Sequence, residues 1–337
     1  MKKIIAIGNA LVDILARLED EKLLSDLALP KGRMTLVSER QARLIREALQ
    51  PYGPQFSTGG CAGNTAKALA GLQASPGFIG TVGHDEVGRF FAESFDACGI
   101  EAQLQEVEAH TGVACTLITP DGERTFGTCL GAAAMIRAED ITPEVLHGYD
   151  ILHVEGYLVQ DEALMENVAR TAKEAGLMLS LDLASPNVVC EYRTLFHGLV
   201  HNYFDIVFAN EEESLAYTQE LTPEASLKAM ARDCMLPVVK LGGRGASALL
   251  NGECVSVPAH QATVVDTTGA GDFFAAGFLY GLVCGAELSR CLQLGALLGG
   301  AVVQKMGTSL SAGEWACLQQ EVRRILGTNQ AEADYFG

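Results

Sequence analysis

A short glycine-spaced stretch constrains this sequence more than any other. The apolar pair Val264-Val265 leads through Asp-Thr-Thr into the turn Gly269-Ala-Gly271-Asp272, after which a long apolar segment begins. This order predicts a strand, a tight turn and a helix. Glycines let the amide N–H groups of such a turn approach a ligand closely, and the first turn of a helix presents unpaired donors with a partial positive charge. The stretch therefore predicts an anion-binding site.

Asp272 stands at the start of the predicted helix. Its carboxylate could accept a proton from a substrate hydroxyl while the amides of Gly269, Ala270 and Gly271 hold the charge that builds on a transferring phosphoryl group. Asp is also a preferred helix cap, and Gly-x-Gly turns are common, so the stretch taken alone fits a structural role equally well.

Length and composition predict one large α/β core. The chain has 337 residues, 48% of them hydrophobic, and 36 glycines. A chain of this size is often one core with a small appendage, and we expect one main α/β domain over residues 1–337. From residue 151 to residue 241, short apolar runs alternate with helix-like stretches, which predicts βα units and a parallel sheet.

Charge and cysteine content exclude several partners. The net charge of -18 argues against nucleic acid, because phosphate backbones bind positive surfaces. No apolar run reaches the roughly 18 residues that span a bilayer, so we expect no membrane segment. The 10 cysteines are scattered without metal-binding spacing, which is typical of reduced thiols in a cytoplasmic protein. The expected partner is a small molecule.

The N-terminal segment combines an apolar run with polar residues. Lys3–Ile7 ends at Gly8 and predicts a central parallel strand. Asn9 and Asp13 follow. Placed just beyond the carboxyl end of that strand, Asp13 could accept hydrogen bonds from a pair of sugar hydroxyls. A solvated Asp at the edge of a strand is the alternative.

Two further glycine-rich turns stand out. Gly59, Gly60 and Gly63-Asn64 approach an alanine-rich helix, and Gly242-Gly243-Arg-Gly245 follows the strand-like Val238-Val-Lys240. The first turn fits packing as well as binding, and the second fits a β-hairpin as well as a phosphate loop in which Lys240 or Arg244 meets phosphates.

An amide and a carboxylate follow another apolar run. Asn210 and Glu213 come directly after Ile206-Val-Phe-Ala209, which places them at the carboxyl end of a predicted strand. Solvated acidic helix starts are common, so a capping role is equally open.

The stretch Asp266-Thr-Thr-Gly-Ala-Gly-Asp272 and the following Phe-Phe-Ala-Ala-Gly-Phe resemble the C-terminal signature of the ribokinase-like (phosphofructokinase-B type) kinases of sugars and nucleosides. The resemblance implies that Asp272 is the catalytic base and that the amides of Gly269, Ala270 and Gly271 form the anion hole. The turn at residues 59–64 resembles the N-terminal signature of the same family.

This second match implies substrate contacts for Gly59, Gly60 and Asn64, and the Gly-Asn-x-x-x-Asp pattern resembles the family's substrate-binding start at Asn9 and Asp13. The resemblance to the family also implies that ATP and Mg²⁺ are the cofactors. It further implies that, in the Asn-x-x-Glu element, Asn210 contacts phosphate and Glu213 holds Mg²⁺ through the waters of the ion. The remaining implied nucleotide-binding residues are Lys240, Gly242, Gly243, Gly245 and Thr268.

The resemblance further implies a possible K⁺ site at the backbone of Asp266 and Gly307, and a three-layer αβα fold with a central, mostly parallel sheet. We expect a small β-sheet lid from about residues 11–50 and 104–130, because short strands and a β-hairpin there would not extend a parallel sheet. Such lids exclude water from the reaction.

The closest likeness within the family is to adenosine-kinase-like enzymes, with Phe126 or Tyr157 as candidates for stacking on a base. The alternatives are a fructokinase- or ribokinase-type sugar kinase, a hydrolase that uses the same anion hole, and a non-catalytic sensor of sugars or nucleosides. The protein could be a monomer or a homodimer.

Overall fold

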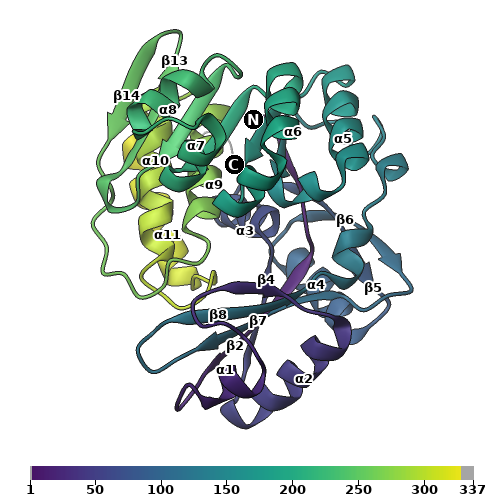
Figure 1. The fold of residues 1–337 in the computed structure, drawn as a ribbon. Helices are drawn as coiled ribbons and strands as arrows, with labels where there is room; N and C mark the ends of the chain where they lie inside the picture. Colours follow the sequence, from purple (N-terminus) through teal and green to yellow (C-terminus); the bar gives the residue numbers. More distant parts are fainter. Residues whose placement is uncertain (1, 328–337) are drawn as a thin grey trace.

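The described chain is built on two β-sheets of unequal size (Figure 1). The computed structural model describes residues 2–327. In order across the larger sheet, its strands are β14 (Glu253–Val257), β13 (Ala246–Leu250), β12 (Leu236–Lys240), β11 (Ile206–Asn210), β10 (Met178–Asp182), β9 (Ile151–Glu155), β1 (Ile4–Ile7), β5 (Gly77–Gly83) and β6 (Glu101–Val107).

All neighbours from β12 to β6 pair in parallel, and β13 and β14 add an antiparallel edge. The central strands are short apolar runs because both of their faces are buried.

Helices cover both faces of the larger sheet. One layer contains α5 (Glu162–Glu174), α6 (Pro186–Tyr203), α7 (Glu211–Thr218) and α8 (Pro223–Met230). The opposite layer contains α3 (Cys61–Gly71), α9 (Ala270–Val283), α10 (Leu288–Val302) and α11 (Ala312–Leu326), while α4 (Glu86–Ala97) packs near β5 and β6. Ile5 and Ile7 of β1 face the first layer, whereas Ile4 faces the opposite layer and Ala6 packs on that same face with residues of α3 and α4, as the period of a strand requires.

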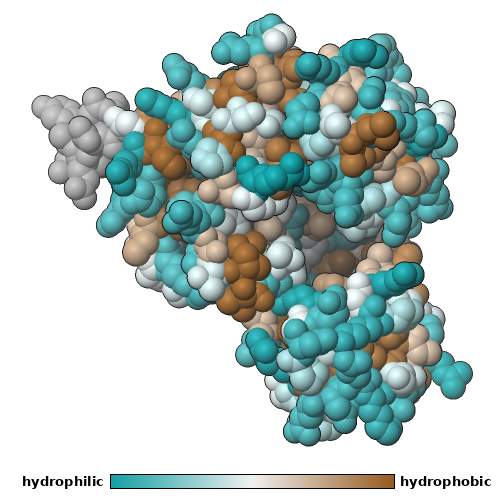
Figure 2. Space-filling model, turned by 60° about the vertical axis from the view of Figure 1, so that its left-hand side comes forward, coloured by the Kyte–Doolittle hydropathy of each residue, from teal (hydrophilic) through white to brown (hydrophobic). Residues whose placement is uncertain are grey.

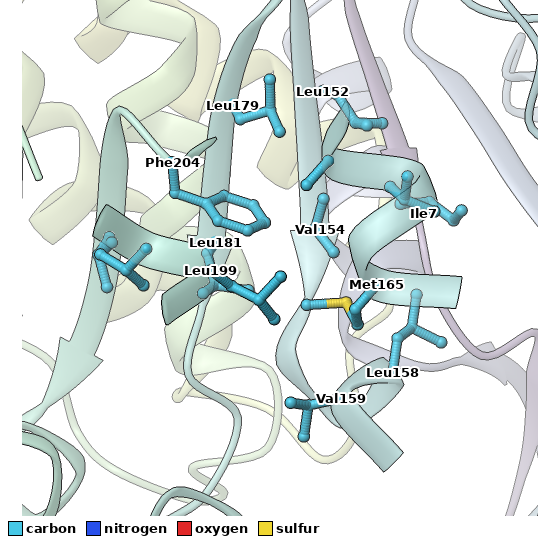
Figure 3. Close-up of a cluster of buried hydrophobic side chains, with 14 of the residues drawn as sticks. Ile7, Leu152, Val154, Leu158, Val159, Met165, Leu179, Leu181, Leu199 and Phe204 are labelled. Carbon is cyan, nitrogen blue, oxygen red and sulfur yellow. The ribbon is translucent and has the colours of Figure 1, made fainter. Parts of the chain in front are cut away.

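Figure 3 shows part of the first core, where Leu181 of β10 lies by Leu199 of α6, and Val154 of β9 lies by Met165 of α5. These side chains are fully or almost fully buried, and their close packing fixes the positions of the strand ends. The expected fold class, three layers around a mostly parallel sheet with a small additional sheet, is confirmed.

The smaller sheet, which we call the lid, has the strand order β3 (Met34–Leu36), β8 (Arg124–Cys129), β7 (Gly112–Ile118), β2 (Leu11–Arg17) and β4 (Gln55–Gly59). Helices α1 (Lys22–Asp26) and α2 (Glu39–Leu49) lie on its outer side (Figure 1). The predicted β-hairpin is present as the antiparallel pair β7 and β8.

The strands depart from the expected lid boundaries of about 11–50 and 104–130. The segment 55–59 pairs with β2 and so belongs to the lid, whereas residues 104–107 belong to β6, which pairs with β5 in the larger sheet. Sequence patterns could not decide these pairings, because each depends on a partner strand distant in the chain.

Two further expectations were wrong. The pair Val264-Val265 does not form a strand; its side chains are 63% and 55% exposed, and the amide of Val265 donates to the carbonyl of Val303 at the end of α10. Asp13 does not lie just beyond the end of β1. It lies inside β2, opposite Ser57 and Ala114, because the chain enters the lid sheet within three residues of β1.

No helix among residues 2–327 is long and apolar enough to cross a membrane.

Candidate active site

The turn before α9 brings backbone donors to the carboxyl end of the larger sheet. Gly269 has a φ of 74°, a conformation that favours glycine, and a Cβ there would lie 2.5 Å from Cγ2 of Thr308. The helix begins at Ala270, which makes Asp272 its third residue. Among the described residues no side chain caps α9, so the alternative role of Asp272 as a helix cap finds no support.

One contact with α3 orients the carboxylate of Asp272, because Nδ2 of Asn64 donates to its Oδ2 at 2.9 Å. The Thr65 hydroxyl lies 3.2 Å from the backbone carbonyl oxygen of Asp272 and so links α3 to the backbone of α9. Burial raises the pKa of Asp272 from 3.8 to about 7, while the hydrogen bond from Asn64 acts in the opposite direction. A carboxyl group with a pKa near neutrality is suited to exchanging a proton at physiological pH.

Asp272 also lines a cavity of about 1010 Å³. Figure 2 shows one face of the molecule hollowed between its larger body and the smaller lobe below it. The predicted residues that line this cavity are Asn210, Glu213, Lys240, Gly242, Gly243, Gly245, Ala270, Gly271 and Asp272. One cavity thus joins the glycine turn before α9 to most of the residues predicted to bind nucleotide.

Buried charges surround the floor of this cavity. Nζ of Lys240 donates to Oδ2 of Asp182 at 2.6 Å, and the carboxylates of Asp182 and Glu213 raise the pKa of Lys240 despite its burial. Burial raises the pKa of Glu213. Asn210 and Glu213 form a capping box at the start of α7, because the side chain of each accepts from the backbone N–H of the other. The capping alternative is therefore realised, beside the cavity.

The glycine turn after β12 forms a tight connection to β13, as in the hairpin alternative, while its three glycines line the cavity. A Cβ at Gly245 would lie 1.9 Å from the carbonyl oxygen of Val257, so this position requires glycine. Arg244 instead pairs with Glu211 on the exposed side of the turn.

The residues predicted to bind substrate gather where the lid meets α3. A Cβ at Gly59 would lie 2.4 Å from Oδ1 of Asp13, and a Cβ at Gly60 would lie 2.1 Å from the carbonyl oxygen of Asn9. Both glycines are therefore needed for contacts within the protein. Burial raises the pKa of Asp13 to about 6, and the nearby Lys67 opposes this shift.

The side chain of Asn9 is buried and donates to Oε1 of Glu155 at 2.6 Å. Asn9 thus contacts the last residue of β9 inside the protein, and its role with substrate stays a prediction.

Comparison with known proteins identifies the family. Residues 37–315 match the model of the pfkB family of carbohydrate kinases. The chain belongs to the pfkB family. It is accordingly a phosphotransferase that uses a hydroxyl group as the acceptor. Within the family it is a sugar or nucleoside kinase and is similar to adenosine kinases.

Relatives of this pfkB kinase carry different substrate names. It is 30% identical to an ATP-dependent ribose-1-phosphate kinase of Halopiger xanaduensis over 74% of the chain and 82% of that protein. It is 24% identical to adenosine kinase 1 of Arabidopsis thaliana over 90% of the chain and 94% of the relative. The crystal structure of adenosine kinase from Sinorhizobium meliloti has a TM-score of 0.86 and 33% identity, covering 95% and 99% of the two chains.

Sequence reasoning missed a lid residue that reaches the glycine turn before α9 in this pfkB kinase. Arg124 of β8 forms an ion pair with the buried carboxylate of Asp266 and donates to the Thr268 hydroxyl at 2.5 Å. The same carboxylate accepts from the amides of Thr268 at 2.8 Å and Gly307 at 2.6 Å. The structure thus brings Asp266 and Gly307, the residues of the predicted cation site, together around the side chain of Asp266. The signal available in the sequence was an arginine directly after the turn of a predicted hairpin.

The raised pKa of Asp272 predicts a stability effect. Because the folded protein holds this proton more tightly than the unfolded chain, the carboxylate destabilises the fold progressively as the pH rises from about 4 to about 7. Asp272→Asn should therefore raise the free energy of unfolding more at pH 8 than at pH 5.5. The difference between the two increases should be roughly 1–2 kcal/mol. Urea unfolding at both pH values measures this. Asp96→Asn in α4 is the matched control, and an equal effect of Asp272→Asn at both pH values would contradict the prediction.

Proposed function

We propose that this protein is an ATP-dependent kinase of the adenosine-kinase type, which phosphorylates a primary hydroxyl of a nucleoside. The position of Asp272 carries the proposal: its carboxylate, with a pKa raised to about 7, borders both the large cavity and the substrate-side group around Asn64. A carboxylate so placed can reach a hydroxyl from one side and a phosphoryl group from the other.

In the proposed mechanism Asp272 accepts the proton of the hydroxyl as its oxygen attacks the γ-phosphorus of ATP. The amides of Gly269, Ala270 and Gly271 stabilise the transferring phosphoryl group, since they lie at the start of α9. Nζ of Lys240 lies 3.0 Å from where a Cβ at Gly271 would stand, so a positive charge supports this turn from behind.

The nucleotide is proposed to occupy the cavity, with Lys240, Thr268 and the glycines of residues 242–245 around it. Asn210 would meet phosphate. Among residues 2–327, no three histidine, cysteine, aspartate or glutamate side chains gather as a direct metal site. This fits Mg²⁺ held by ATP and by water, with Glu213 accepting from a metal-bound water, because Mg²⁺ keeps several of its waters. When bound, the ion neutralises phosphate charge.

The lid supports a nucleoside over a free sugar. Residues directly opposite one another in a sheet share a face, and Asp13 shares its face with Leu15, Phe126, Met34 and Leu36 through the pairings of β2, β7, β8 and β3. Met34 and Leu36 are 48% and 54% exposed. A sugar ring presents hydroxyls at every edge, whereas a nucleobase presents an apolar face that such a surface can cover.

A sugar-kinase function is the second candidate, and the polar pair Asp13 and Asn64 is what favours it, since both can bind hydroxyls without contacting a base. For either function we propose a cytoplasmic enzyme, monomeric or homodimeric, that acts on small molecules.

The proposal is tested by ADP release from Mg-ATP with adenosine, inosine, cytidine, ribose, fructose, 2-keto-3-deoxygluconate and ribose 1-phosphate. We expect the highest kcat/KM with a nucleoside. ADP release that needs no acceptor would indicate a hydrolase, and preference for a free sugar would favour the second candidate.

Asp272→Asn should lower kcat about 10²- to 10⁴-fold with the best acceptor, the range for loss of a general base. Near-full kcat would remove Asp272 from this role.

The lid face gives a separate prediction. Phe126→Ala should raise KM for a nucleoside about 10-fold or more, because an aromatic contact with the base is lost, and leave KM for ribose nearly unchanged. Phe56→Ala is the matched control, since Phe56 lies opposite Ile14 on the other face of the lid and is 51% exposed. Equal effects of Phe126→Ala on both substrates would argue against a base-binding lid.

We also propose that K⁺ binds near the backbone of Asp266 and Gly307 and organises the anion hole. The hydrogen bond between Oδ2 of Asp266 and the amide of Gly307 supports this, because it brings the two segments together. Activity should then rise with K⁺ concentration at fixed Mg-ATP and constant ionic strength. A flat dependence would remove the proposed site.

A further inference from the structure

A chain of hydrogen bonds runs from a buried cation to the carboxylate of Asp272. Nζ of Lys67 lies 3.1 Å from the Thr308 hydroxyl, that hydroxyl lies 3.0 Å from Oδ1 of Asn64, and Nδ2 of Asn64 lies 2.9 Å from Oδ2 of Asp272. The four residues come from α3, from the loop after α10 and from α9. Asn64 and Thr308 are almost fully buried.

The chemistry of the first group fixes the direction of every bond in this chain. An ammonium group can only donate, so the oxygen of Thr308 accepts from Lys67. A hydroxyl carries one proton, which Thr308 must then donate to Oδ1 of Asn64. The Asn64 amide is thereby oriented with its N–H groups toward Asp272, where only an acceptor can complete the bond.

We infer that Lys67 and Thr308 are positioning residues, which hold the Asn64 amide so that Asp272 faces a donor and is kept as a proton acceptor. Neither residue needs to touch the reacting atoms for this role. A donor toward a carboxylate stabilises its charged form, whereas an amide oxygen in the same place would stabilise the protonated form. The orientation of one amide group therefore decides whether Asp272 is ready to take a proton.

Other titratable groups also act on Asp272. They are Glu155 of β9, Asp182 of β10, Lys240 of β12 and the thiol of Cys61 of α3, which stays neutral because burial raises its pKa. Lys67 itself also interacts electrostatically with Asp272. Asp182 and Glu155 oppose ionisation of Asp272 and Lys240 favours it. Lys67 has a second contact, because it also donates to the backbone carbonyl of Thr58 in β4. Lys67 additionally faces Asp13, so a change at Lys67 affects more than one group.

Thr308→Val is the discriminating variant, since it removes only the hydroxyl and keeps the shape of the side chain. The Asn64 amide then loses the partner that sets its orientation. We expect the acidic limb of the kcat profile to move to higher pH by about 0.5–1 pH unit, which lowers kcat at pH 6 about 3- to 10-fold. Thr308→Ser should restore the profile, because serine keeps the donor. Lys67→Met should move it in the same direction as Thr308→Val.

Thr81→Val is the matched control, as Thr81 is a buried threonine of β5 outside the site. It should leave the pH profile unchanged. A profile for Thr308→Val that falls in height without moving along the pH axis would overturn the inference, because a purely structural role lowers activity or stability without shifting the limb.

A second measurement does not depend on turnover, so it separates this inference from the proposed function. Urea unfolding of Thr308→Val is compared at pH 5.5 and pH 7.5, with Asp272 present and with Asp272→Asn. We expect Thr308→Val to reduce stability more at pH 7.5 than at pH 5.5 with Asp272 present, and equally at both pH values with Asp272→Asn. The same pH difference in both backgrounds would overturn the inference even if the kinase reaction is established, whereas absence of turnover in the wild type would overturn only the proposed function.

Discussion

The site depends on keeping several carboxylates at the carboxyl end of the larger sheet with few cations to balance them. Asp182, Glu155 and Glu213 are each buried near Asp272, and Lys240 is the cation that pairs with Asp182. Burial of charge is costly unless it is paired or hydrogen-bonded. Each of these carboxylates accordingly accepts a specific donor, and the raised pKa values of Asp272, Glu155 and Glu213 show that part of the cost of burial remains. A phosphate group brought into the same space would meet backbone amides and Lys240.

The fold supplies these groups by a single geometrical rule. Parallel strands end at one edge of a sheet, so β9, β10, β11 and β12 bring Glu155, Asp182, Asn210 and Lys240 to the same edge. Two helices that cover one face of the sheet, α3 and α9, begin beside this edge. They contact each other there through the hydrogen bond between Asn64 and Asp272. Rigid packing of the cores on both faces of the sheet fixes these positions, which a reaction sensitive to small displacements requires.

Local chemistry made much of the fold predictable, and long-range pairing set the limit. The turn at Gly269 and the start of α9 could be predicted because glycine and a following apolar helix are local signals. The irregular backbone at Val264-Val265 could not be predicted, since β-branched residues favour strands. Here the amide of Val265 instead donates to the carbonyl of Val303, which is distant in the chain. Asp13 was expected at a strand end because Gly8 indicated a turn, yet the chain enters a second sheet at once.

The site shows the same limit. Motifs pointed to Asp272, Glu213 and Lys240, which line one cavity and whose roles stay predictions. In contrast, the contact of Lys67 with Thr308 spans 241 residues and that of Arg124 with Thr268 spans 144. Neither partner carries a sequence signal of the other. The glycines at 59 and 60 were predicted to contact substrate, which stays a prediction, while their close contact with Asp13 and Asn9 became visible only in three dimensions.

The pairing of Arg124 with Asp266 has a consequence for the movement of the lid. The carboxylate of Asp266 is fully buried in the loop before α9, and its positive partner, Arg124, belongs to the lid sheet. If the lid moved away, the carboxylate of Asp266 would either stay buried without its positive partner or become hydrated. Opening of the lid would therefore require water to reach the loop that precedes α9.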